Sequence, residues 1–82
     1  MEVIFILYFN SVTPNNDYTL SIVFDNYYEI RFPMIHLLKQ FRFSPLRDLN
    51  VWKRVELFPT HLEWNMGTFQ VNLNIEEIVR NF

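Results

Sequence analysis

Hydrophobic and polar residues alternate along five stretches of the chain, which is the pattern of β-strands that bury one face. The apolar positions are Tyr18, Leu20, Ile22 and Phe24; Tyr28, Ile30 and Phe32; Val55 and Leu57; Leu62 and Trp64; and Phe69, Val71 and Leu73. An earlier stretch, Val3 to Val12, is rich in β-branched and aromatic residues and is also predicted to be a strand. The sequence therefore predicts six strands.

The turns between these stretches predict how the strands pair. A three-residue turn, Asp25 to Tyr27, joins the second and third strands, and the segment from Phe58 to His61 joins the fourth and fifth. The cross-strand pairs predicted by counting outward from the two turns are Phe24 with Tyr28, Ile22 with Ile30, Val55 with Trp64, and Leu57 with Leu62. Both pairings are antiparallel.

Two further stretches have helical spacing. Pro33 suits the first position of a helix with apolar residues at Met34, Leu37, Leu38 and Phe41. The second helix follows Asn74, which forms a variant capping box with Glu77, and its apolar residues are Ile75, Ile78, Val79 and Phe82. We therefore predict a single α+β domain over residues 1–82, a two-layer sandwich in which two short helices pack on one face of a mainly antiparallel sheet.

Composition narrows the possible functions. The chain of 82 residues has no cysteine, which excludes disulfides and thiolate metal sites and suits a reducing cytoplasm. Its longest apolar run, Val3 to Phe9, is far shorter than the roughly 20 residues of a membrane span, so no membrane association is expected. The formal net charge of −2 gives no general attraction to nucleic acid, and direct binding to it is not expected.

The candidates for chemistry are few. His61 and Glu63 lie on the same face of a predicted strand, with Glu56 opposite Glu63, so that an acid and base cluster is geometrically allowed. A solvated ion pair is the favoured interpretation because Arg54 can offset the acids. His36 has no second histidine four residues on and is assigned to the surface. We assign no catalytic residue, metal or cofactor, and expect the protein not to be an enzyme.

Basic and aromatic residues interleave between residues 39 and 54. The residues concerned are Lys39, Arg42, Arg47, Lys53 and Arg54, with Phe41, Phe43 and Trp52. One interpretation places Phe41 and Trp52 in the core and treats the cations as scattered solubilising charges. The other is a surface that binds a protein partner, formed by Phe43, Arg42 and Trp52, because aromatic residues and arginine are enriched at interfaces. Phe43 falls outside the helical stripe.

The first predicted strand offers a second route to a partner. Val3 to Phe9 is apolar on both faces, which fits a central buried strand and also fits edge-to-edge pairing with another copy. Burial within the monomer is the favoured alternative, and a homodimer built through the sheet edge is the other.

The order and spacing of these residues resemble a small bacterial family, the domain-of-unknown-function (DUF) family 2442. The resemblance is carried by Asp17-Tyr18, Leu20, Phe24-Asp25-Asn26, Phe32, Leu37-Leu38, Leu46-Arg47-Asp48, Trp52, Val55, Glu63-Trp64, Gly67 and Glu77-Ile78. It implies a compact α+β domain, in some members fused to a helix-turn-helix module, and one half of a toxin and antitoxin type pair is among the roles it implies. Members commonly have a glycine where this chain has Tyr27.

Two functional hypotheses follow from the sequence. The first is a small cytoplasmic protein-interaction or regulatory module without catalysis. The alternative is a nucleic-acid accessory or transcription-regulatory domain that acts beside a helix-turn-helix protein.

Overall fold

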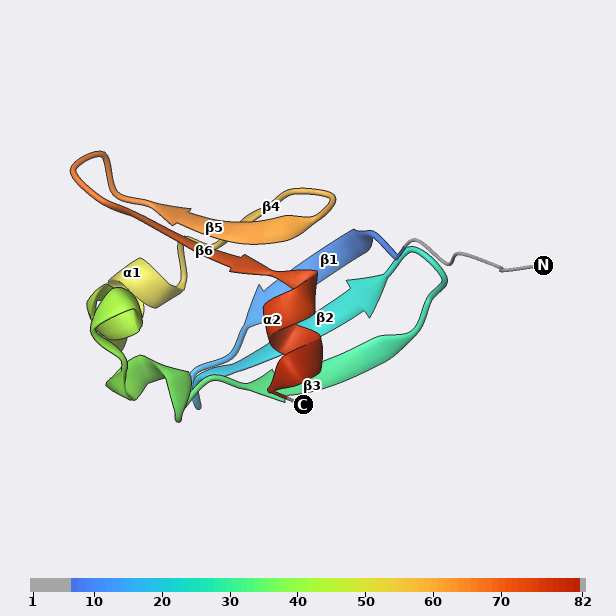
Figure 1. Cartoon of the computed structure of the whole chain (residues 1–82), viewed down its shortest axis with the longest axis horizontal. Coiled ribbons are helices and arrows are strands. Elements are labelled where there is room, and N and C mark those ends of the chain that lie inside the picture. Colours follow the sequence, from blue (N-terminus) through green and yellow to red (C-terminus); the bar gives the residue numbers. More distant parts are fainter. Residues whose placement is uncertain (1–6, 82) are drawn as a thin grey trace.

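The computed structural model describes residues 7–81 and divides their six strands between two three-stranded antiparallel sheets (Figure 1). The first sheet contains β1 (Phe9–Pro14), β2 (Thr19–Phe24) and β3 (Glu29–Pro33), and the second contains β4 (Glu56–Leu57), β5 (His61–Asn65) and β6 (Gln70–Asn74). Between the sheets in sequence lie the 3₁₀ helices η1 (Leu37–Lys39) and η2 (Phe41–Arg47) and the helix α1 (Leu49–Trp52), and α2 (Ile75–Arg80) follows β6. The predicted α+β class is confirmed.

The cross-strand pairing follows the predicted register. Ile22 pairs with Ile30 across β2 and β3, and Leu57 pairs with Leu62 across β4 and β5. The first strand begins at Phe9, and residues 3–6 of the stretch predicted as a strand lie outside the described residues. Since the alternation of side chains has a period of two, a correct register also places the correct residues on the buried face.

Both sheets contribute to one hydrophobic core. Its buried residues are Phe9, Leu20, Ile22, Phe24, Phe32, Met34, Leu37, Leu38, Phe43, Leu46, Trp52, Leu62, Trp64, Val71, Leu73 and Ile78. Ile30 and Val55 are half-buried and pack against this cluster. The described residues contain no buried polar or charged side chain, so burial of apolar area is the main contribution to folding. No helix within residues 7–81 has the length and apolar composition needed to cross a membrane.

Three aromatic side chains connect the first sheet to the second. Tyr18, just before β2, lies 5.2 Å from Trp52 of α1, and Trp52 stacks on Trp64 of β5 at 5.8 Å, both measured between ring centroids. The indole of Trp52 donates to the carbonyl of Asn15 at 2.8 Å, which ties α1 to the turn between β1 and β2. The two sheets are thereby held to one another through α1.

The helix predicted from Pro33 to Phe41 is wrong in its length and in one buried position. Pro33 ends β3, and the segment after it forms two short 3₁₀ helices that are interrupted at Gln40, which is extended at ψ 140°. Met34, Leu37 and Leu38 are buried as predicted, but Phe41 is 94% exposed. The interruption changes the phase of the helical turn, so Phe43 enters the core in place of Phe41.

The second helix agrees with its prediction at the N-terminus. The side chain of Asn74 accepts a hydrogen bond from the backbone N–H of Glu77 at 2.9 Å, as the capping box requires. Ile78 is buried, whereas Val79 is 67% exposed, and Phe82 lies outside the described residues. In Figure 1 this helix is drawn across the sheet of β1 to β3.

Candidate interaction surface

Two of the three residues predicted to bind a partner are buried in the core, and the third, Arg42, is bonded to other segments of the fold. Phe43 and Trp52 are fully buried, with no exposed surface in either side chain. The expectation that Phe43 lies at the surface is therefore corrected, because the interruption at Gln40 turns its side chain into the core. These two residues stabilise the monomer, and neither is accessible to a partner of the folded chain.

Arg42 has a structural role as well. Its guanidinium donates to the backbone carbonyl of Asn72 at 2.6 Å and to both carboxylate oxygens of Glu77 at 2.7 and 2.8 Å. It also lies 4.3 Å from the centre of the Phe43 ring. Arg42 therefore ties η2 to β6 and α2, and occupies a carbonyl on a strand edge that would otherwise be open to another strand.

His61, Glu63 and Glu56 have the predicted relationship along and across the strands. Nε2 of His61 lies 3.7 Å from Oε1 of Glu63, and Glu63 pairs with Glu56 across β5 and β4. The same Glu63 oxygen accepts a hydrogen bond from Gln70, and the His61 ring stacks on Phe58 at 4.7 Å. Within residues 7–81 no group of three or more histidine or acidic side chains is placed to hold a metal ion.

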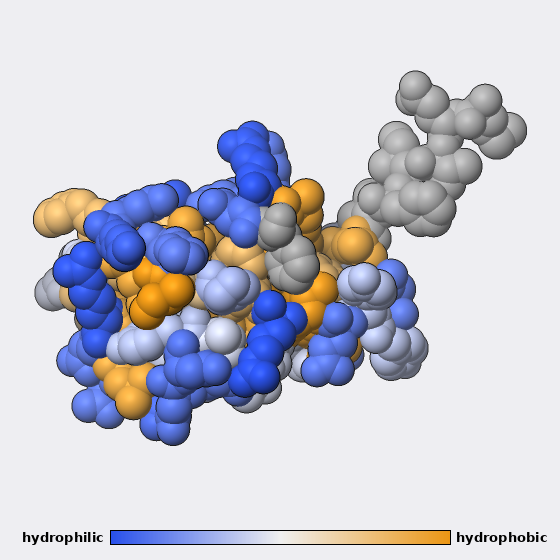
Figure 2. Space-filling view, turned by 90° about the horizontal axis from the view of Figure 1, so that it is seen from below, coloured by the Kyte–Doolittle hydropathy of each residue, from blue (hydrophilic) through white to orange (hydrophobic). Residues whose placement is uncertain are grey.

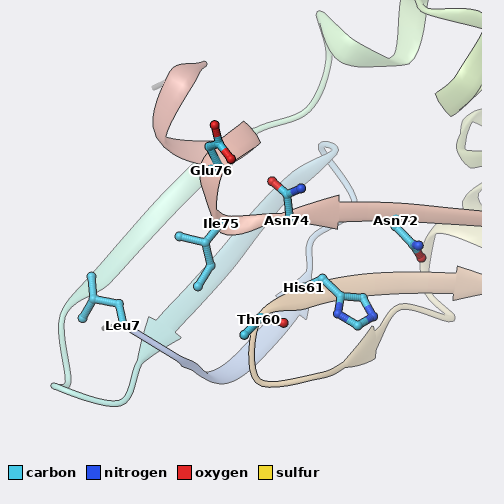
Figure 3. A pocket seen from close by; sticks show the side chains of 7 residues that line it. All are labelled: Leu7, Thr60, His61, Asn72, Asn74, Ile75 and Glu76. Carbon is cyan, nitrogen blue, oxygen red and sulfur yellow. The ribbon is translucent and has the colours of Figure 1, made fainter. Parts of the chain in front are cut away.

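An open hollow of about 670 Å³ lies beside this cluster (Figure 3). Its lining consists of Leu7, Thr60, His61, Asn72, Asn74, Ile75 and Glu76. His61 and Asn72 lie close together at one end in Figure 3, whereas Glu63 is not among the lining residues. The hollow thus presents hydrogen-bonding groups, but the carboxylate that would assist His61 as an acid or base lies outside it.

A second hollow, smaller and more apolar, was not predicted. It measures about 290 Å³ and is lined by Tyr18, Ile35, Leu38, Lys39 and Arg47, which we call the basic hollow. Ile35 is 51% exposed. The apolar walls come from the turn before β2, from the turn between β3 and η1, and from η1, and the two cations come from η1 and η2. Figure 2 shows apolar surface at this end of the molecule, surrounded by hydrophilic side chains.

The two cations that line the basic hollow, Lys39 and Arg47, have no carboxylate partner within residues 7–81. Arg31, Arg42 and Arg80 pair with Asp17, Glu77 and Glu76. Four other cations form no ion pair with a carboxylate of residues 7–81, namely Lys39, Arg47, Lys53 and Arg54. All four belong to the segment 39–54, which the sequence had marked as basic.

Phe41 is the residue that the sequence pattern misplaced. It completes a helical stripe with Leu37 and Leu38, so periodicity assigns it to the core. Phe41 and Phe43 are two residues apart, and the choice between them depends on whether the helix continues through Gln40. Pro45 lies beyond the predicted helix and argues against its continuation past Phe41, since proline removes a backbone donor inside a helix, but it does not decide between the two phenylalanines.

One of three comparisons with known proteins finds a match, and it gives a family. The model of the family described as "Protein of unknown function (DUF2442)" matches residues 9–82. Neither a curated protein nor a solved structure matches the chain. The resemblance inferred from the sequence is thereby confirmed over nearly the whole chain.

Proposed function

Because the chain belongs to the DUF2442 family of proteins of unknown function, we propose its role from its own surface: a small protein-interaction module without catalysis. The observation that carries this proposal is the 94% exposure of Phe41. Burial of a large aromatic side chain is favourable by about 1.5–3 kcal/mol of free energy, and a partner surface that covers Phe41 would supply it. Exposed aromatic residues near arginine and lysine are the common anchors of protein interfaces.

The backbone around Phe41 is held in place, which favours a binding role. The backbone N–H of Phe43 donates to the carbonyl of Gln40 at 3.1 Å, and the Ser44 hydroxyl donates to the carbonyl of Phe41 at 2.8 Å. Phe43 anchors the same turn in the core. Because the turn is already ordered, little further conformational entropy is lost when a partner covers the aromatic side chain.

A binding role is favoured over catalysis because the side chains of the His61 cluster are occupied within the fold, whereas Phe41 is exposed. His61 and Glu63 are engaged with each other, with Phe58 and with Gln70. Phe41, in contrast, exposes nearly its whole side chain. We expect the protein to act in a reducing cytoplasm, where a small domain without cysteine is at no disadvantage.

The test compares two exposed phenylalanines in the native host. Tagged wild type, Phe41→Ala and Phe69→Ala would be used for crosslinking and co-purification, since Phe69 is 41% exposed on a different part of the chain. We expect a specific protein to co-purify with the wild type and with Phe69→Ala, and to be lost with Phe41→Ala at an unchanged melting temperature. Equal recovery with all three proteins would overturn the proposal.

The alternative function, a nucleic-acid accessory or regulatory domain, is supported by the four cations of the segment 39–54 that form no ion pair within residues 7–81. Lysine and arginine with an aromatic side chain can hold a single strand through phosphate contacts and base stacking. An electrophoretic shift with single-stranded oligonucleotides at moderate salt distinguishes the two functions. Binding that persists there and is lost with Lys53→Glu would support the alternative, and binding seen at very low salt alone would reflect general charge attraction.

A further inference from the structure

We propose that the basic hollow binds a short acidic peptide segment of a partner protein, with one large apolar side chain in the hollow and a neighbouring aspartate or glutamate on Lys39 and Arg47. The inference rests on the proposed function and specifies the chemistry of the partner. It does not depend on Phe41, which is not among the residues that line the hollow. The two proposals can therefore fail separately.

The size and lining of the basic hollow suit one side chain. Its volume of about 290 Å³ lies at the lower limit of small-molecule pockets, about 300 Å³, which is too small for most cofactors. Tyr18, Ile35 and Leu38 offer a ring and two branched aliphatic chains as contact surface. An apolar side chain inserted among them gains burial without leaving a polar group unpaired.

The walls of the basic hollow are held by hydrogen bonds. The Tyr18 hydroxyl donates to the carbonyl of Arg47 at 2.5 Å, and Nε of Arg47 donates to the carbonyl of Leu38 at 2.8 Å. The backbone N–H of Met34 donates to the carbonyl of Tyr18 at 2.9 Å. A preformed site of this kind reduces the entropy lost on binding.

Tyr18 itself adopts an unusual backbone conformation. Its φ is +62°, in the left-handed region that residues with a Cβ seldom occupy. The contacts with Trp52, Arg47 and Met34 compensate for this strain. The result is that the tyrosine ring forms both a wall of the basic hollow and a contact with the core.

Charge complementarity determines the occupant. Lys39 and Arg47 line an apolar hollow and have no carboxylate partner within residues 7–81. Arg47 uses its Nε within the fold, and no bond within the described residues engages its two Nη groups, which can donate to a carboxylate. An apolar side chain followed by an acid satisfies both features of the site. A nucleic-acid strand would satisfy the cations alone, and the net charge of −2 opposes it.

The experiment uses the full chain and a random peptide library displayed on phage. We expect the selected peptides to share a large apolar residue next to aspartate or glutamate. Binding of one selected peptide, measured by fluorescence polarisation, is expected to weaken by at least about fivefold in Lys39→Glu and in Ile35→Ser. Lys53→Glu is the matched control, because it reverses an exposed cation that does not line the hollow, and should retain binding.

Several outcomes would overturn the inference. They are a library that enriches no peptide, a consensus without acidic residues, and an equal loss of binding in Lys39→Glu and Lys53→Glu. Competition by a single-stranded oligonucleotide at the same affinity would also contradict it. If Phe41→Ala alone abolishes capture of a host protein while no peptide binds the hollow, the proposed function survives and this inference does not.

Discussion

The indole N–H of Trp64 donates to the backbone carbonyl of Trp52 at 2.8 Å, and the two rings stack at an angle of 18°. This pair joins β5 of the second sheet to α1, and both side chains are fully buried. A buried carbonyl that loses its donor retains the cost of its desolvation. Removal of the indole donor is therefore expected to destabilise the folded state.

We predict that Trp64→Phe lowers the free energy of unfolding by about 2 kcal/mol, from the lost hydrogen bond and the unfilled volume. Urea denaturation followed by circular dichroism would measure it. Phe69→Leu, at a site that is 41% exposed, should change the same quantity by less than about 0.5 kcal/mol. Equal effects of the two substitutions would show that the indole contact contributes nothing.

The two phenylalanines of η2 should differ sharply in stability. Phe43 is fully buried and Phe41 is 94% exposed, so Phe43→Ala is expected to cost about 3–5 kcal/mol and Phe41→Ala less than about 0.5 kcal/mol. The measurement is the urea midpoint of each variant against the wild type. A large loss in Phe41→Ala with a small loss in Phe43→Ala would reverse the assignment of core and surface.

Tyr27 closes the turn between β2 and β3 with φ at +66°. Asparagine tolerates the left-handed region better than tyrosine does, and Tyr27 is 84% exposed, so little packing is lost on replacement. Tyr27→Asn should raise the free energy of unfolding by about 0.5 kcal/mol and the melting temperature by about 3 °C. Tyr28→Asn, at the exposed neighbour with no left-handed backbone, is the control and should not stabilise.

Asp17 should give the protein a dependence of stability on pH in the acid range. The hydroxyl of Thr19, then the N–H of Thr19, and to a smaller extent Arg31, lower the pKa of Asp17 from its ordinary value of 3.8. Because the folded pKa is depressed, the contribution of the carboxylate is present above pH 3.8 and is lost as the pH falls through the folded pKa.

The corresponding measurement is the urea midpoint of Asp17→Asn and of the wild type across this range. At about pH 7 the wild type should be more stable, and the part of the difference that comes from charge should disappear below the folded pKa. Arg31→Gln should lower the midpoint less than Asp17→Asn does. A constant difference at all pH values would contradict the depressed pKa.

Much of the sheet structure could be predicted because its determinants are local. Turn length set the pairing of Ile22 with Ile30, and the alternation of apolar residues identified the buried face. The cap of α2 was equally local, since Asn74 and Glu77 are three residues apart. Of the candidate sites, the His61 cluster was predicted for the same reason, as its members are neighbours on paired strands.

By itself, then, the sequence determined that the six strands form, the register of β2 with β3 and of β4 with β5, and the beginning of the last helix, because each depends on residues that are close in the chain or joined by a short turn. Tertiary structure decided that Phe43 and not Phe41 enters the core, that Arg42 contacts Glu77, and that the strands form two sheets. The basic hollow is also a tertiary feature, formed where Tyr18 meets η1 and Arg47. These outcomes depend on packing between segments far apart in sequence, which periodicity does not report.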